Sequence, residues 1–248
     1  MPATPAWPPK SLPRLFVRRA LLEGAAVELD ASQANYLGNV MRLGLGAELL
    51  IFDGESGEWL ARIAEASKKR MSLTVERRRR EPETIPDVWL AFAPVKRAQT
   101  DWLVEKATEL GVARLLPVIT QRTNTERVRL NRLQTIAIEA AEQCGRTMLP
   151  DIAEPVALKQ LLRDRDAGRR LYFADEGGGE RAAAAFKDGP ALILTGPEGG
   201  FPDDERALIR SQANAVPISL GPRILRAETA ALAAVAVFMA LAGDWATY

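Results

Sequence analysis

Two glycine-containing segments have the residue types and spacing of a ligand-binding pocket. Residues 194–201 read LTGPEGGF, and residues 220–229 read LGPRILRAET. Each segment follows a short apolar run, and an apolar run that ends at a glycine predicts a buried strand entering a tight turn. In open α/β sheets, ligands bind beyond the carboxyl ends of such strands. The two segments therefore predict one pocket, built largely from backbone.

The residues around these segments limit the chemistry of the ligand. Neither segment has the Gly-Lys-Ser/Thr ending of a P-loop or the glycine spacing of a dinucleotide fingerprint. The helix expected after the first segment opens with Pro202 and the acidic residues 203–205. Because these carboxylates already interact with the positive end of the helix dipole, a phosphate there would be repelled. The pocket suits a neutral, zwitterionic or cationic ligand, unless the glycines only form a tight turn.

The composition excludes several kinds of catalytic site. The chain has no histidine and one cysteine, so it contains no histidine base, no histidine metal ligand and no thiolate cluster. No Gly-x-Ser-x-Gly motif is present. We therefore expect no metal, and chemistry that relies on carboxylates, arginines and backbone dipoles.

Charge and hydropathy bear on partners and location. The 33 basic and 32 acidic residues balance, but the first 80 residues carry 13 basic and 9 acidic ones, which is compatible with RNA binding. The longest apolar stretch, residues 230–243, is too short to span a bilayer, and the N-terminus lacks the layout of a signal peptide. We expect a cytoplasmic protein that does not enter a membrane.

The order of elements predicts two domains. Residues 12–80 are β-rich, with strands at 15–17, 48–52, 59–63 and 72–75 and one helix at 32–41, which predicts a small β-barrel. Residues 77–86, with four arginines and two prolines, are interpreted as a linker whose charges are solvated or contact RNA. From residue 87 to 248, strands and helices alternate, which predicts parallel βαβ units. The expected strands are 88–95, 115–119, 170–174, 191–194 and 217–220, and the expected helices are 100–110, 127–144, 158–164, 203–212 and 228–242. Residues 177–179, three glycines, are interpreted as a flexible loop without a functional role.

Two helices carry further signals. Arg122, Arg127, Arg129 and Arg132 lie before or off the apolar stripe of the helix at 127–144, so they either contact RNA or form a solvated face. The last helix is apolar nearly all round, which predicts burial against its own sheet and in a homodimer interface. Burial within a monomer is the alternative.

The two glycine segments belong to a larger set of matching motifs. Together with KATELGV at 106–112 and EAAEQCGR at 139–146, they resemble the uridine-N3 methyltransferase family of small-subunit ribosomal RNA, which belongs to the SPOUT superfamily. RLFV at 14–17, VMRL at 40–43 and FDG at 52–54 resemble its PUA-like domain. The resemblance covers nearly the whole chain beyond the first dozen residues. It implies a C-terminal SPOUT α/β trefoil-knot domain and an N-terminal PUA-like β-barrel.

The resemblance also implies a reaction and its site. S-adenosyl-L-methionine, a cation at sulfur without phosphate, donates a methyl group to N3 of a specific uridine near the 3′ end of 16S ribosomal RNA in the assembled 30S subunit. The implied enzyme is a homodimer with its site near the interface. The expected cofactor-binding residues are Leu194, Thr195, Gly196, Gly199, Gly200, Leu220, Gly221, Ile224, Leu225, Arg226 and Thr229. The expected RNA-binding residues are Arg14, Arg42, Arg122, Arg129, Arg132 and Arg223. Family members often have a histidine where this chain has residues 33–35, Gln-Ala-Asn, so any RNA contact by that histidine is missing here.

The expected catalytic residues are Arg226 and Glu198. Uracil N3 must lose its proton before or during methyl transfer, and Arg226 would stabilise the negative charge that develops. Glu198 is a candidate base, with Glu228 as another carboxylate in reach of this segment. Two alternatives stay open: another SPOUT methyltransferase acting on a ribose 2′-hydroxyl or on tRNA, and a non-catalytic RNA-binding assembly factor of the same fold.

Overall fold

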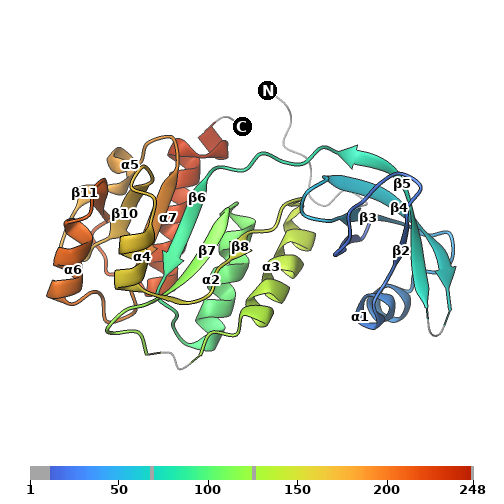
Figure 1. The fold of residues 1–248 in the computed structure, drawn as a ribbon, viewed down its shortest axis with the longest axis horizontal. Coiled ribbons are helices and arrows are strands. Elements are labelled where there is room, and N and C mark those ends of the chain that lie inside the picture. Colours follow the sequence, from blue (N-terminus) through green and yellow to red (C-terminus); the bar gives the residue numbers. More distant parts are fainter. Residues whose placement is uncertain (1–11, 68–69, 125–126, 247–248) are drawn as a thin grey trace. The chain divides into compact units, whose positions relative to one another are not determined.

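The computed structural model describes residues 12–67, 70–124 and 127–246, and the chain divides into two units (Figure 1). The N-terminal unit contains the residues up to Glu83 together with Gly145–Met148. The C-terminal unit contains Thr84–Cys144 and the residues from Leu149 onward.

The N-terminal unit is a curled five-stranded sheet in the order β1-β3-β4-β5-β2. The only parallel pair in this sheet is β1–β3. Its buried side chains, among them Leu49, Ile51 and Leu73, form one hydrophobic core. The strands are β1 (Arg14–Phe16), β2 (Ala26–Glu28), β3 (Glu48–Phe52), β4 (Glu58–Ala66) and β5 (Met71–Arg80).

The helix expected at residues 32–41 is two consecutive elements. α1 (Ala31–Asn35) starts at a capping box in which the Asp30 side chain accepts from the Gln33 N–H and the Gln33 side chain accepts from the Asp30 N–H. The chain continues as a π-helical turn, η1 (Tyr36–Val40). Only Leu37 of these ten residues is buried, so one side of both elements stays exposed.

The segment interpreted as the start of a linker is a strand, so that prediction is wrong for residues 77–80. β5 continues to Arg80 because β4 is long enough to pair with it, with Leu60 opposite Arg77 and Trp59 opposite Arg78. The arginines have partners: Arg78 stacks over the Trp59 ring at 5.5 Å, and Arg80 forms an ion pair with Glu58 at 2.9 Å. The four arginines at 77–80 therefore belong to the last part of β5, and two of them, Arg78 and Arg80, contact side chains of β4.

The C-terminal unit is a parallel sheet in the order β11-β13-β10-β12-β6-β7-β8, with β9 paired to β7. Its strands are β6 (Val88–Phe92), β7 (Arg114–Ile119), β8 (Asp151–Ile152), β9 (Val156–Ala157), β10 (Arg170–Ala174), β11 (Glu180–Arg181), β12 (Ala191–Thr195) and β13 (Ala215–Ser219). The helices are α2 (Arg97–Glu109), α3 (Leu130–Cys144), α4 (Leu158–Asp164), α5 (Ala182–Ala185), α6 (Asp203–Arg210) and α7 (Ala227–Ala242), followed by a 3-10 turn, η2 (Asp244–Ala246).

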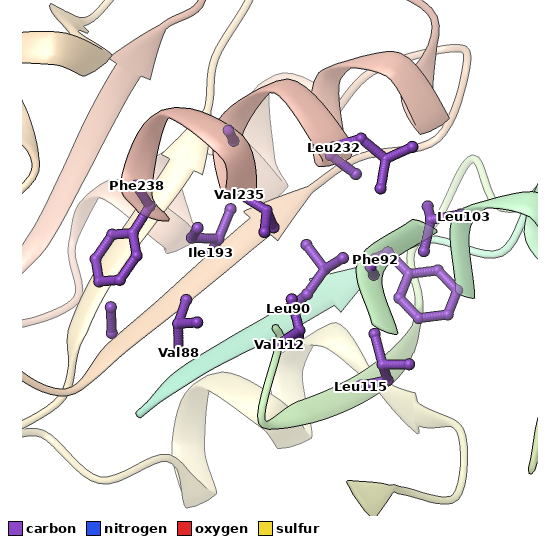
Figure 2. Packing of buried hydrophobic residues seen from close by; sticks show 14 of the residues in the cluster. Val88, Leu90, Phe92, Leu103, Val112, Leu115, Ile193, Leu232, Val235 and Phe238 are labelled. Carbon is purple, nitrogen blue, oxygen red and sulfur yellow. The ribbon is translucent and has the colours of Figure 1, made fainter. Parts of the chain in front are cut away.

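Helices cover both faces of this sheet. One core contains residues of α2, α3, α5 and α7, and the other contains residues of α4 and α6. Figure 2 shows Leu232, Val235 and Phe238 of α7 packed over β6 and β12, where they meet Val88 and Ile193. The expected alternation of parallel strands and helices is confirmed.

Two element boundaries differ from expectation for local reasons. The strand expected at 88–95 ends at Phe92, shortly before Pro94, which has no N–H to donate to a neighbouring strand. α2 begins at Arg97 rather than at residue 100, since the Gln99 and Thr100 N–H groups already donate to the Lys96 carbonyl, and the Thr100 hydroxyl bonds back to Val95. The helix expected from residue 127 begins at Leu130.

The part of the chain that the structure describes contains no helix long and apolar enough to cross a bilayer. Within the same residues, no group of three or more acidic or cysteine side chains is arranged to hold a metal ion.

Candidate functional site

A cavity of about 230 Å³ lies at the carboxyl ends of β10, β12 and β13. Three loops form most of its wall, and it is completed by Arg206 of α6 and by Ala227 and Ala230 in the first turn of α7. The loops are the first loop (residues 195–201, after β12), the second loop (residues 218–225, at the end of β13) and the third loop (residues 174–178, at the end of β10). The position of this cavity is where open α/β sheets bind ligands.

The first loop is shaped by its glycines. Gly200 has φ +64°, and a Cβ there would collide with the Glu176 carboxylate. A Cβ at Gly196 would lie 3.0 Å from the Phe201 ring, which packs into the core below the loop. Glycine lets the backbone approach these neighbours, so the loop stays close to the cavity.

The second loop turns at Gly221, which has φ +111° and open space where a Cβ would lie. Ile224, in the same loop, leaves 92% of its side chain exposed. α7 follows with Arg226 as its N-cap residue. An apolar side chain exposed at the wall of a cavity is a surface that a ligand can cover.

The third loop was missed by sequence reasoning, which gave the glycines at 177–179 no functional role. Asp175 is buried and forms ion pairs with Arg210 at 2.6 Å and Arg206 at 3.2 Å. The Asp175 carboxylate also accepts a hydrogen bond from the Gly177 N–H at 2.8 Å. This bond turns the loop, and Gly178 lies in the cavity wall. The signal was present, because this loop also follows a buried strand and contains glycines.

The expected cofactor-binding residues are only partly brought together. Leu194 is fully buried in the core below the first loop, and Gly199, Arg226 and Thr229 also lie outside the cavity wall. The residues of that set that line the cavity are Thr195, Gly196, Gly200, Leu220, Gly221, Ile224 and Leu225.

The two expected catalytic residues lie in different places. Glu198 is exposed and lines the cavity. Arg226 is exposed at the start of α7 but is not part of the wall, whereas Arg223, expected to bind RNA, is. Glu228 is 7% exposed, and its Oε2 has no hydrogen-bond partner among the described residues. A buried carboxylate in the first turn of a helix interacts favourably with the helix dipole.

The segment after β7 holds the first loop in position. Arg122 donates to the Gly199 carbonyl at 2.6 Å. Gln121 donates from its backbone N–H to Glu205 at 2.9 Å and from its side chain to Asp204. The hydrogen bond from Gln121 lowers the pKa of Asp204. The acids at the start of α6 are thus engaged with protein groups, as expected for a site that does not bind phosphate there.

Arg129 and Arg132 line a second cavity, separate from the first. Arg132 forms an ion pair with Asp101 at 2.7 Å. The hydrogen bonds that the Arg132 guanidinium donates to Asp101 raise the pKa of Arg132. Arg129 has no ion pair with a carboxylate of the described residues.

The two expected RNA-binding arginines of the N-terminal unit differ in their accessibility. The Arg14 side chain is 11% exposed, with its Nε 2.7 Å from Glu58 and its guanidinium 4.7 Å from the centre of the Phe52 ring. It also donates to the Arg146 carbonyl. Arg42 is exposed and has φ +56°, which is rare for a residue with a side chain. Arg14 is engaged inside the sheet, while Arg42 faces solvent.

Residues 33–35, which replace the family's histidine region, have structural hydrogen bonds. Gln33 donates to the Phe16 carbonyl at 2.8 Å in addition to closing the capping box. Asn35 accepts from Asn39 at 2.7 Å. The Gln33 side chain therefore ties α1 to β1, and the Asn35 side chain links α1 to η1.

Comparisons with known proteins agree with this architecture. A family model described as an RNA methyltransferase domain matches residues 81–239, and one described as an RNA methyltransferase PUA domain matches residues 29–76. Ribosomal RNA small subunit methyltransferase E of Rickettsia conorii is 32% identical over 229 residues, which covers 90% of this chain and 93% of that protein.

Two solved structures are also similar. A putative methyltransferase from Legionella pneumophila, in complex with the bound cofactor SAM, has a TM-score of 0.87 at 31% identity. Ribosomal RNA small subunit methyltransferase E from Neisseria gonorrhoeae, bound to S-adenosyl methionine, has a TM-score of 0.86 at 28% identity. Each comparison covers 94% of this chain and 99% of the other.

The parallel sheet, the loops at its strand ends and the matched models define an RNA methyltransferase of the SPOUT class with a PUA domain. This confirms the expected fold class. The chain belongs to the ribosomal RNA small subunit methyltransferase E family.

Proposed function

We propose that this chain transfers a methyl group from S-adenosyl-L-methionine to N3 of a specific uridine near the 3′ end of 16S ribosomal RNA, in the assembled 30S subunit. The observation that carries the proposal is the three-loop cavity at the strand ends. It lies in a chain whose relatives include a small-subunit ribosomal RNA methyltransferase solved with S-adenosyl methionine.

The cavity fits the cofactor in shape and in charge. The open space beside Gly221 and the exposed Ile224 offer room and an apolar surface for the adenosine portion. The wall carries both signs of charge: the carboxylates of Glu176 and Glu198 and the guanidiniums of Arg206 and Arg223. A ligand with both a cationic and an anionic group, such as the methionine part of the cofactor, is complementary to such a wall. When bound there, S-adenosyl-L-methionine supplies an electrophilic methyl group. The wall residues proposed to hold it are Thr195, Gly196, Gly200, Leu220, Gly221, Ile224 and Leu225, joined by Gly178 of the third loop. Leu194, Gly199, Arg226 and Thr229 lie outside the wall and stay predictions as cofactor contacts.

The chain's own residues act on the uracil. In this proposal Arg226 stabilises the negative charge that develops as the N3 proton leaves, as a positive charge beside the reacting group does. Glu198 accepts that proton. The two residues lie on different loops at the same edge of the sheet, so their alignment with the methyl group depends on the loops being held in place.

The remaining proposals concern partners and domains. Residues 12–80 form an RNA-binding domain, and residues 87–248 form the methyltransferase domain. The RNA is contacted by Arg42, Arg122, Arg129, Arg132 and Arg223. An RNA contact by Arg14 stays a prediction and is not part of this proposal, because the Arg14 guanidinium is paired with Glu58. The protein acts as a homodimer through α7. It works in the cytoplasm, where its ribosomal substrate is found.

The reaction is tested by transfer of labelled methyl from S-adenosyl-L-methionine to small subunits and to naked ribosomal RNA, with the modified nucleoside identified. A methyl at N3 blocks the Watson–Crick edge, so we expect one strong reverse-transcriptase stop that disappears when the protein is deleted. A ribose-methylated nucleoside, or a stop that persists after deletion, contradicts the assignment. Transfer to tRNA alone points to another SPOUT methyltransferase, and cofactor binding without transfer points to a different role.

The role of Arg226 has its own test. Arg226→Ala should lower kcat more than it lowers the affinity for either substrate, because its interaction forms as charge develops in the transition state. Arg226→Lys should recover part of the rate if positive charge suffices, and little if a planar guanidinium is needed. An alanine variant that loses only cofactor affinity contradicts the catalytic role.

A further inference from the structure

A second cavity lies beside the cofactor cavity along the same edge of the sheet. Its volume is about 470 Å³. It begins where β6 ends, at Pro94 and Val95, and continues over the first turn of α2 to the residues around the start of α3. The described residues of its wall are Pro94, Val95, Lys96, Arg97, Thr100, Asp101, Asn124, Arg127, Val128, Arg129, Arg132 and Leu133.

The charge of this cavity is strongly positive. Five cationic side chains line it against one carboxylate among the described wall residues, that of Asp101. Asp101 is already paired with Arg132 at 2.7 Å and with Arg97 at 3.9 Å. No carboxylate of a described residue forms an ion pair with Lys96, Arg127 or Arg129. Five clustered cations that share one carboxylate favour an anionic ligand.

The cations continue beyond this cavity. Arg127, Arg129 and Arg132 also line an adjoining hollow that includes Glu154 and Pro155. A single small anion would occupy one of these hollows. A row of cations that borders two of them matches the repeated phosphates of a nucleic acid strand.

The helix at this cavity differs from the helix at the cofactor cavity. α2 has no acidic residue in its first turn and no side-chain cap, whereas the first turn of α6 carries Asp203, Asp204 and Glu205. The positive end of the α2 dipole therefore adds to the field of the five cations. The same end of α6 carries its own carboxylates, so the second cavity is the one of the two beside which a helix N-terminus is free of acidic side chains in its first turn.

Strand register places the two cavities next to each other. β6 and β12 are neighbouring parallel strands, with Phe92 opposite Thr195, and the Ala93 N–H donates to the Thr195 carbonyl at 3.1 Å. Thr195 belongs to the cofactor cavity, and Pro94 to the second one. Neighbouring strands are about 4.8 Å apart, so a ligand in one cavity lies within reach of a ligand in the other.

We propose that this second cavity is the site where the substrate RNA strand binds through its phosphates, with Lys96, Arg97 and Arg127 as contacts in addition to Arg129 and Arg132. The inference rests on the proposed function for the identity of the RNA. Asp101 acts as a positioning residue that holds Arg97 and Arg132 toward the cavity. Phosphates held here place a neighbouring base at the ends of β12 and β13, where the methyl donor binds.

The test compares two double variants with equal loss of charge. Lys96→Ala/Arg127→Ala removes two proposed phosphate contacts, and Arg181→Ala/Lys187→Ala removes two exposed cations from β11 and the segment after α5, outside both cavities. Lys96 and Arg127 are both exposed, so we expect their removal to leave the fold intact, which circular dichroism checks. Binding of a labelled single-stranded RNA copied from the 3′ end of small-subunit ribosomal RNA is measured against salt concentration, and S-adenosyl-L-methionine binding by calorimetry.

We expect Lys96→Ala/Arg127→Ala to flatten the plot of log affinity against log salt by about 1.4, since each lost contact to a single strand removes about 0.7. At roughly 0.1 M salt this corresponds to about 25-fold weaker RNA binding. The control variant should bind RNA like the wild type, and both variants should bind S-adenosyl-L-methionine like the wild type. In methyl transfer to small subunits, the first variant should raise KM while kcat stays close to the wild-type value.

The outcomes separate this inference from the proposed function. If the wild type methylates N3 and Lys96→Ala/Arg127→Ala has unchanged salt dependence and KM, the second cavity is not the RNA site and the function stands. If the variant loses RNA binding as expected but the wild type methylates another position, the site stands and the proposed reaction is wrong. Equal losses in both double variants show a general charge effect and overturn the inference.

Discussion

Asp175 offers the sharpest test of how the cofactor cavity is held together. Its carboxylate side chain is 1% exposed and lies between Arg206 and Arg210, whose side chains are 24% and 43% exposed. Asp175→Asn keeps the size of the side chain and a hydrogen-bond acceptor for the Gly177 N–H, but it removes the charge. Breaking a buried ion pair from one side costs about 3–5 kcal/mol, and the lower end applies because both guanidiniums reach water.

We therefore expect Asp175→Asn to lower the free energy of unfolding of the C-terminal unit by about 3 kcal/mol. For a unit of this size, that loss lowers Tm by roughly 6–12 °C. Urea unfolding followed by circular dichroism measures the free energy, and calorimetry measures Tm. The two readouts should agree on the unfolding transition of this unit.

Asp203→Asn is the matched control, because Asp203 pairs with the same Arg206 at 3.2 Å but is fully exposed. An exposed pair at a helix N-terminus contributes less than about 1 kcal/mol. If both variants lose the same stability, or if Asp175→Asn loses less than about 1 kcal/mol, the burial argument is refuted. Asp175→Ala also removes the acceptor for Gly177, so it should weaken S-adenosyl-L-methionine binding about tenfold more than Asp175→Asn does.

Further predictions follow from the glycines, the buried Glu58 and α7. Gly221→Val should abolish S-adenosyl-L-methionine binding in calorimetry because position 221 has φ +111°, and Gly196→Val should do so because its side chain would meet the Phe201 ring. Unchanged binding would show that these loops are not the cofactor site. Burial alone would raise the pKa of Glu58, but hydrogen bonds from Arg80 and Arg14 and their charges outweigh it, so the pKa is lowered. The N-terminal unit should therefore lose stability as pH falls below the ordinary glutamate range, and Glu58→Gln should reduce this dependence in pH-resolved unfolding. Val235 is fully buried in the core, so Val235→Glu should unfold the C-terminal unit. Val237 is only partly buried against the same core, so Val237→Glu should cost less stability and convert a dimer to a monomer in light scattering. A folded wild-type monomer at micromolar concentration would contradict the homodimer.

The first and second loops were visible in the sequence because their signals are local. An apolar run that ends in glycine predicts a strand followed by a turn, whatever the rest of the chain is. This signal was enough to place Gly196 and Gly221 in the wall of a pocket. The third loop has the same signal at residues 170–179. It was dismissed because nothing in the sequence indicates that β10 lies between β12 and β13.

The arginines show the same limit. Nothing in the sequence distinguishes Arg14 from Arg42 or Arg129 as a candidate RNA contact. In the structure, Arg14 is paired with Glu58, which lies 44 residues away in the chain. Arg80 was assigned to a linker because its partner on β4 is also distant in the chain. Whether a charge is free or paired depends on non-local contacts, which hydrophobic periodicity does not report.

The sequence by itself determined the alternation of strands and helices after residue 87, the backbone character of the pocket and the lack of histidine chemistry, because these depend on residue identity and short-range spacing. The tertiary structure decided which three loops meet, that Arg223 rather than Arg226 lines the cofactor cavity, and that Lys96 joins Arg127 at a second cavity one strand away. These facts follow from strand order and register, which bring distant segments to one edge of the sheet.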